Sequence, residues 1–202
     1  MKSKNNFTGI FIKYWSLVGL IIAVAILVII YLNRGGIRSF TRWYLWLLVP
    51  IMMIHNFEES FFPGKFLPWV NGACYKSNNG SSPMGPVPAA IIGIVNCWII
   101  TAIAALTSEY SIVLPLIVLF FFFANAWMHV SYTMTQRLYS PGAITSFVLI
   151  IPFCIFSLVR FGLNSKISIA LAVTTYLVGN LLHFVMFALP ARGLKKKDNT
   201  PN

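Results

Sequence analysis

The apolar residues of this chain are gathered into six long runs separated by short polar stretches. Each run is close to the about 20 residues that a helix needs to cross a bilayer. The runs are continuous and do not alternate apolar with polar positions, which argues against membrane-spanning strands. The pattern therefore predicts an all-α, polytopic bundle of about six transmembrane helices. The six runs are residues 11–32, 43–62, 87–106, 111–133, 143–161 and 167–189.

The composition supports a membrane protein. Hydrophobic residues make up 58% of the 202-residue chain and charged residues 9%, whereas ordinary soluble domains carry about 25% charged residues. So few charges leave no room for a separate soluble domain of any size. The net charge of +11 is typical of basic loops and tails that orient membrane proteins and contact anionic headgroups. We therefore expect membrane lipid as a partner, and no nucleic acid.

The distribution of lysine and arginine predicts the orientation. If all six runs cross, one side of the membrane carries ten basic residues and the other carries five. The positive-inside rule then places both termini in the cytoplasm, with a multi-pass chain in the inner (cytoplasmic) membrane. We expect an N-terminal anchor helix and basic loop at 1–42, a membrane domain at 43–190 and a basic, disordered tail at 191–202. The loop at 63–86 is expected to be a surface connection or a lid.

All three histidines of the chain lie inside the expected spans, and each has polar neighbours about one helical turn away. Residues three or four apart share a helix face. Ionisable residues cost about 2.5–3.5 kcal/mol at the bilayer centre, so they usually face the bundle interior and carry function. The three polar patches are His55 with Glu58 and Glu59, His129 with Asn125, and His183 with Asn180.

The three patches are expected at similar depths. At a rise of about 1.5 Å per residue, the histidines lie about 18, 27 and 24 Å from the starts of the second, fourth and sixth runs. These runs cross in the same direction, so all three patches fall in the second half of a crossing. We therefore predict that His55, His129 and His183 converge with Glu58 or Glu59 to within about 5 Å, the reach of a shared metal or water.

Three imidazoles and a carboxylate in a low-dielectric pocket suit one divalent transition metal, and zinc is the metal that we expect. Catalytic zinc takes three protein ligands of the His and Glu type and leaves one position open for water. Carboxylate di-iron bundles use about four glutamates, which is more than this chain offers. The candidate residues are His55, Glu59, His129 and His183 for metal ligation, Glu58 and Glu59 for catalysis, and Asn125 and Asn180 for orienting ligands or binding substrate.

The stretch YSPGAIT, residues 139–145, opens the fifth run. Ser140 suits an N-cap, and Pro141 suits the first position of a helix. The free amides of that helix start, together with Tyr139, could hold an anionic group of a substrate.

Three motifs occur in order: HNFEE at 55–59, NAWMH at 125–129 and YSPGAIT at 139–145. Together they resemble the HXXEE family of bacterial integral membrane proteins, which carries HXXEE, NxxxH and YxPGxxT patterns. The resemblance covers roughly residues 43–190 and adds Thr145 to Tyr139 as a residue that binds substrate or supports the ligands. It supports the site but implies no reaction, because the activity of the family is unassigned.

A weaker likeness is to the CAAX-type intramembrane proteases, which use paired glutamates and two histidines on neighbouring helices. Two positions depart from that family. Pro63 stands where its EExxxR motif has arginine, and Phe187 stands where its last motif has a polar residue.

The function that we expect is a metal-dependent, hydrolase-like enzyme that acts on a lipid-soluble substrate, either a hydrophobic small molecule or a peptide. Two alternatives remain open: a metal-free glutamate intramembrane protease, and a carrier of protons, metal ions or a small solute that uses the same residues as a relay. The chain shows no repeated halves of the kind that many transporters have. A scaffold protein would need these polar residues only for stability.

The orientation can be tested with a reporter fused after Asn202. The excess of basic residues on one side predicts that this reporter reads as cytoplasmic. A reporter that reads as periplasmic or extracellular would overturn the assignment.

Overall fold

The computed structural model describes residues 4–37, 42–77, 83–164 and 167–198. Every regular element within these ranges is helical, which confirms the all-α prediction. The elements are α1 (Lys4–Leu32), α2 (Arg34–Ile37), η1 (Trp43–Leu47), α3 (Leu48–Ser60), α4 (Phe66–Trp69), η2 (Val70–Cys74), α5 (Pro86–Ile92), η3 (Gly93–Ile100), α6 (Thr101–Thr107), α7 (Val113–Gln136), α8 (Ala143–Thr145), η4 (Ser146–Ile150), α9 (Ile151–Asn164) and α10 (Ile169–Asp198).

Several elements join end to end into longer rods. Five such helices in the described ranges are long and apolar enough to cross a membrane. The second expected span is shorter: the five residues of η1 and the 13 of α3 give an 18-residue rod. Its length is about 30 Å, which matches the hydrocarbon core of a bilayer. The five long helices are Thr8–Leu32, Pro86–Thr107, Val113–Gln136, Ala143–Leu163 and Ile169–Pro190.

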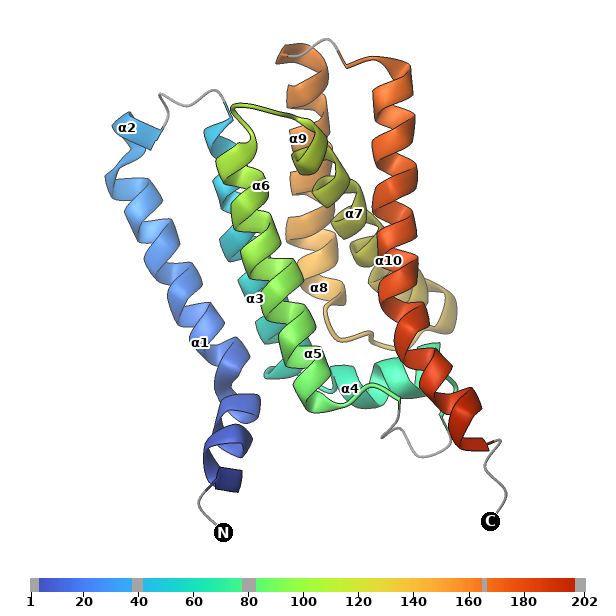
Figure 1. Ribbon diagram of the computed structural model, residues 1–202. Helices are drawn as coiled ribbons and strands as arrows, with labels where there is room; N and C mark the ends of the chain where they lie inside the picture. The colour runs from blue at the N-terminus through green and yellow to red at the C-terminus, as the bar shows by residue number, and fades with distance from the viewer. Residues whose placement is uncertain (1–3, 38–41, 78–82, 165–166, 199–202) are drawn as a thin grey trace.

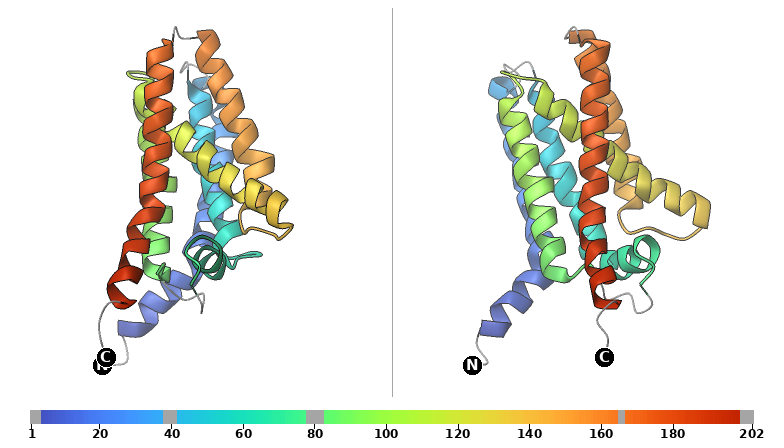
Figure 2. Two further views of the ribbon diagram at one scale, coloured as in Figure 1. Left: turned by 90° about the vertical axis from the view of Figure 1, so that its right-hand side faces the viewer. Right: turned by 45° about the vertical axis from the view of Figure 1, so that its right-hand side comes forward.

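Successive long rods run in opposite directions, so α1 begins at the same end of the bundle at which α10 finishes (Figure 1). α1 packs against α3, while α7 packs against both α9 and α10. Figure 2 shows that α7 is tilted relative to its neighbours, and its C-terminal end reaches outward toward the turn that leads into α8. Met52, Leu119 and Phe122 are among the fully enclosed side chains of the core between these helices.

α7 and α10 approach each other closely at Gly179. A Cβ atom at this position would lie 2.7 Å from the carbonyl oxygen of Ile117 and 2.9 Å from Cβ of Phe120. A glycine is therefore required at the contact, and it fixes how far α10 is shifted along α7.

The connection between α3 and α5 folds back across the end of the bundle, where α4 lies beneath the neighbouring helices in Figure 1. Asn71 holds it closed, because its side-chain amide donates to the Met84 carbonyl at 3.0 Å and its oxygen accepts from the Met84 amide at 2.9 Å. Of the two possibilities expected for this loop, the structure shows a cover over the end of the bundle.

The C-terminal segment differs from its expectation. We expected 191–202 to be a disordered tail, but α10 continues to Asp198. Leucine, arginine, lysine and alanine dominate this stretch and are all good helix formers. The expectation is therefore corrected for 191–198, and residues 199–202 lie outside the described part of the chain.

The close approach at Gly179 can be tested by Gly179→Ala. Overpacking of this kind costs about 1–3 kcal/mol, so we expect a lower melting temperature in detergent. Gly162→Ala is the matched control, because an added Cβ there meets no atom within 4 Å and alanine favours the helix by up to about 1 kcal/mol. Equal melting temperatures for the two variants would contradict the packing described here.

Candidate metal centre

The polar residues predicted from the sequence meet where the end of α3 faces α7 and the turn between α7 and α8. His55 and Glu59 are four residues apart on α3, so they share one face of that helix. His129 comes from the second half of α7. The side chains of Glu58 and Glu59 are almost completely enclosed, with exposures of 5% and 8%. Burying a carboxylate is costly unless it is paired or hydrogen-bonded, so the partners of each glutamate define the site.

Glu59 lies between the two histidines. Its Oε1 is 3.4 Å from Nε2 of His55 and 3.2 Å from Nε2 of His129. One ligand atom from each of the three residues lies within 4.8 Å of the others. Nε2 of His129 is buried and makes no hydrogen bond, so the short contact with Glu59 is not a directed N–H···O interaction. The group of His55, Glu59 and His129 could therefore hold a metal ion.

The second nitrogen of His55 is fixed by the helix start of α8. Nδ1 of His55 lies 2.8 Å from Oγ1 of Thr145, and that hydroxyl donates to the Gly142 carbonyl at 3.3 Å. If the Thr145 hydroxyl donates to Gly142, Nδ1 of His55 is the protonated nitrogen and donates to Thr145. Nε2 then faces Glu59 and accepts a hydrogen bond from the Asn125 amide at 3.3 Å, a bond that a metal bound to Nε2 would replace.

His129 is anchored in the same way from the neighbouring turn. Its Nδ1 lies 2.8 Å from Oγ of Ser140, which leaves Nε2 to face Glu59. The indole ring of Trp69, on α4, stacks on the imidazole with ring centroids 4.9 Å apart and planes at 27°. The cover formed by the α3–α5 connection thus closes directly over one histidine. Hydrogen bonds to the outer nitrogen of this kind are what orient metal-binding histidines in proteins.

Glu58 has a different role from Glu59. Its carboxylate accepts from the backbone amides of Ile144 at 3.0 Å and Thr145 at 2.7 Å, and from the Tyr139 hydroxyl at 2.5 Å. The anion therefore caps the positive end of the long helix that begins at Ala143. The sequence suggested that this helix start could hold an anionic group of a substrate. The structure instead places the protein's own glutamate there.

Tyr139 is suited to donate its phenolic proton to Glu58. Burial and the adjacent Glu58 carboxylate hold the pKa of the Tyr139 phenol above its usual range. The phenol therefore keeps its proton at any physiological pH and continues to donate to Glu58.

Gly142 lets the turn approach α3. Its φ of +96° lies in the left-handed region, which side chains other than glycine's rarely tolerate. A Cβ there would also lie 2.7 Å from Cε1 of His55 and 3.0 Å from Cγ of Glu59. The positive φ and the lack of space for a Cβ atom both require glycine at position 142.

Asn56 completes the surroundings of Glu59, and sequence reasoning missed it. Its amide nitrogen lies 3.3 Å from Oε2 of Glu59, and its oxygen accepts from the Trp98 indole at 3.0 Å. The signal that could have found it was an asparagine inside an apolar run, next to His55. Trp69 was also missed, and only the fold-back of the covering segment brings it to His129.

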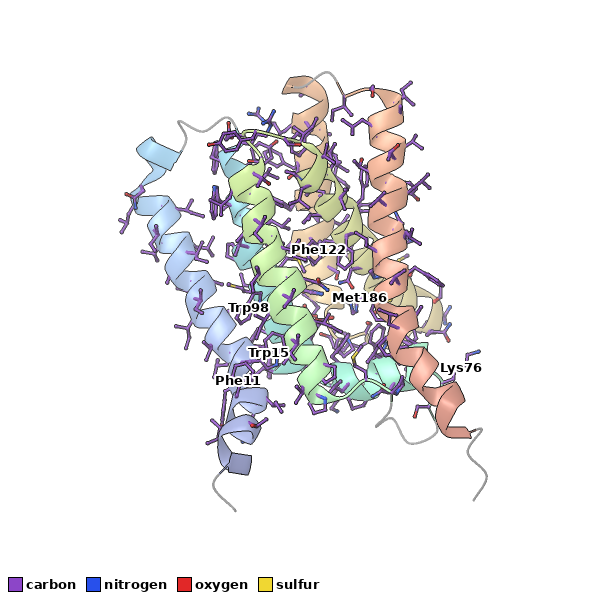
Figure 3. All side chains as sticks on the ribbon, in the orientation of Figure 1. Phe11, Trp15, Lys76, Trp98, Phe122 and Met186 are labelled. Atoms are coloured by element: carbon purple, nitrogen blue, oxygen red, sulfur yellow. The ribbon has the colours of Figure 1, made fainter. Side chains whose placement is uncertain are left out.

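A small cavity of about 50 Å³ adjoins the histidine–glutamate group. This volume is enough for a few water molecules, since one water needs roughly 10–15 Å³ by this measure. Figure 3 labels three residues of its wall: Trp15 on α1, Phe122 on α7 and Met186 on α10. Its polar lining includes His55, Glu59 and Asn125.

His183 and Asn180 do not join the group. The ring of His183 packs against Phe121 and Phe187 at 5.5 and 5.1 Å, and its Nε2 has no hydrogen-bond partner. Phe121 precedes His129 by eight residues, or about 12 Å along the helix. The Asn180 amide donates to the Tyr176 carbonyl of its own helix. The depth estimate placed His183 level with His129, but the close contact at Gly179 sets its ring beside Phe121, earlier along α7 than His129.

The match to known proteins agrees with this geometry. A family model described as "Protein of unknown function with HXXEE motif" matches residues 46–157, which contain His55, Glu59, His129 and the turn at 139–145 but not His183. No curated protein matches the chain, and no solved structure matches it either. The matched segment is 112 of 202 residues, more than half of the chain. The protein belongs to the HXXEE family of proteins of unknown function.

Proposed function

We propose that this membrane protein binds one divalent metal ion, zinc, at His55, Glu59 and His129, and that it hydrolyses a lipid-soluble substrate there. The observation that carries the proposal is the short distance from Oε1 of Glu59 to each histidine nitrogen, in a group whose three ligand atoms lie within 4.8 Å of one another. Tetrahedral ligands that lie about 2.0–2.1 Å from a zinc ion are about 3.3–3.4 Å from one another. The two distances from Oε1 of Glu59 to the histidine nitrogens are 3.4 and 3.2 Å.

The donor set fits zinc in its chemistry as well as in its spacing. Two imidazoles and one carboxylate are a ligand set of catalytic zinc, which keeps a fourth position open. The outer nitrogen of each histidine is already held by a hydroxyl, from Thr145 and Ser140. Nε2 of His129 lies 3.2 Å from Oε1 of Glu59 without the geometry of a hydrogen bond. Such an arrangement is costly for a buried polar atom, and a bound metal would remove that cost.

Bound zinc would supply Lewis acidity, lowering the pKa of a coordinated water and polarising a carbonyl group. The residues of the chain would do the rest. Oε1 of Glu59 faces the histidines, and Oε2, held by Asn56, would accept a proton from water in the cavity. The Asn125 amide would donate to an oxygen of the substrate. Glu58 is bound to three donors, so it would position the turn and take no proton.

The membrane setting defines the kind of substrate. The site lies at the end of the bundle where α1 begins and α10 finishes (Figure 1). With the orientation expected from the basic residues, this end would face the cytoplasm. A substrate held in the membrane would reach the site from the bilayer, while water would come from the cytoplasmic side.

Metal binding can be tested with His129→Ala, with His183→Ala as the matched control. Loss of a ligand is expected to lower zinc affinity by more than the 10–100-fold that follows loss of an outer hydrogen-bond partner. His183 lies outside the group, so its variant should keep the zinc content of the wild type. Elemental analysis of the purified proteins provides the measurement. Equal zinc in His129→Ala and wild type would refute the metal site.

The two glutamates should respond differently to replacement by glutamine. Glu59→Gln is expected to lose zinc and activity with little change in fold. Glu58→Gln should keep zinc but lower the free energy of unfolding by about 1–3 kcal/mol, because buried amide donors lose a charged acceptor. Zinc content and thermal stability of the two variants separate these effects. If both variants keep zinc and both abolish a proton-coupled flux in vesicles, a carrier function replaces the enzyme.

A further inference from the structure

An apolar groove of about 500 Å³ runs along the outside of the bundle between α5–η3, α7 and α10. The residues that α10 and α7 contribute recur with the spacing of a single helix face. Volumes of this size are typical of small-molecule sites. The lining comes from α10 at Leu182, Val185, Met186, Leu189 and Pro190, from α7 at Leu114, Ile117, Val118, Phe121 and Phe122, and from the third rod at Ile92, Asn96 and Ile100.

The groove adjoins the small cavity beside Glu59, because five residues line both: Ile92, Asn96, Phe121, Phe122 and Met186. At this boundary the Asn96 amide contacts Sδ of Met186 at 3.4 Å. Methionine is unbranched and adapts its shape readily. The contact therefore joins η3 to α10 through a side chain that can move aside.

We infer that the groove is the lateral entrance for a single hydrocarbon chain, which lies along α10 while its polar end passes Asn96 and Met186 to reach Glu59. The inference rests on the proposed function and names its substrate class: an amphiphile with one alkyl chain and a small, uncharged reactive group. The small volume of the inner cavity limits that group to a few heavy atoms.

The apolar lining of the groove favours a hydrocarbon chain over a peptide as its occupant. Asn96 is the one polar side chain among the groove residues. A peptide in an extended form would need partners for its backbone amides and carbonyls within the membrane, where each unsatisfied group costs several kcal/mol. A hydrocarbon chain needs none.

Selectivity for this substrate must come from contacts with its polar end. Lipid tails are as apolar as leucine, so an alkyl chain gains little by moving from the bilayer into the groove. Burial in the groove orients the chain, and the hydrogen-bonding groups around the cavity hold the head. Asn96, Asn125 and Glu59 are the polar groups along this path.

The test uses two photoreactive forms of hexadecanamide in lipid nanodiscs, one with a diazirine at mid-chain and one with a diazirine next to the amide. Mass spectrometry locates the label. The mid-chain probe should label the groove face of α10, at Leu182, Val185 and Leu189, several-fold more than the outer face at Leu177 and Leu181. The probe labelled near its head should reach Met186 or Asn96.

Val185→Trp should fill the groove and reduce the groove label several-fold. Leu181→Trp is the matched control, since Leu181 is 60% exposed and does not line the groove. Even labelling of both faces of α10, unaffected by Val185→Trp, would overturn the inference. If Val185→Trp fails to fold, the ratio between the two faces in the wild type still decides.

The same samples separate the two proposals. Labelling is measured on zinc-loaded and metal-stripped protein, because the path of the chain does not depend on the metal. Face-selective labelling in a protein that binds no zinc would refute the proposed function but support the groove as the entrance for a hydrocarbon chain. Zinc binding together with even labelling of both faces of α10 would refute only the inference that the groove is an entrance.

Discussion

Two adjacent carboxylates buried in an apolar bundle are the constraint on which the rest of the structure depends. Neither Glu58 nor Glu59 can remain there without partners, since an isolated buried charge costs far more than a folded domain can offset. The fold provides partners for the two carboxylates in two different ways. Glu58 receives two backbone amides and a phenol. Glu59 receives two imidazoles and an asparagine. The first arrangement saturates its carboxylate with donors, whereas the second leaves Oε1 between two imidazole nitrogens at 3.4 and 3.2 Å.

The turn at 139–145 serves both arrangements at once. Tyr139 and the amide of Thr145 bind Glu58, while Ser140 and the hydroxyl of Thr145 orient the two histidines. Gly142 provides the space for these contacts. Because the same seven residues hold a structural carboxylate and the candidate ligands, the position of Glu58 against the helix start also sets the position of His55. Stability and chemistry are therefore coupled through this turn.

Local patterns in the sequence predicted the all-α class, the spans and most of the site, because burial of polar residues in apolar runs is a local signal. His55, Glu59 and His129 followed from it, and so did Asn125 as a neighbour of His129, whereas Thr145 came from the family resemblance. Three features depended on contacts distant in sequence and could not be predicted in this way. The register set by Gly179 keeps His183 away, the fold-back of the α3–α5 connection brings Trp69 to His129, and the docking of α8 on Glu58 distinguishes the two glutamates.

The register of α10 also explains why the bundle is open where it is. α7 and α10 approach closely at Gly179, because glycine lets the α10 backbone lie against the Ile117 carbonyl and the Phe121 amide of α7. The groove lies alongside this contact, and its lining includes Phe121 of α7 with Leu182 and Met186 of α10. The π-helical η3 forms part of the third wall, and π-helical turns commonly mark functional sites. Its consecutive residues Asn96 and Cys97 face different partners, Met186 at the groove and Asn56 beside Glu59. The glycine contact and the π-helical turn thus border an apolar groove that adjoins the cavity beside Glu59.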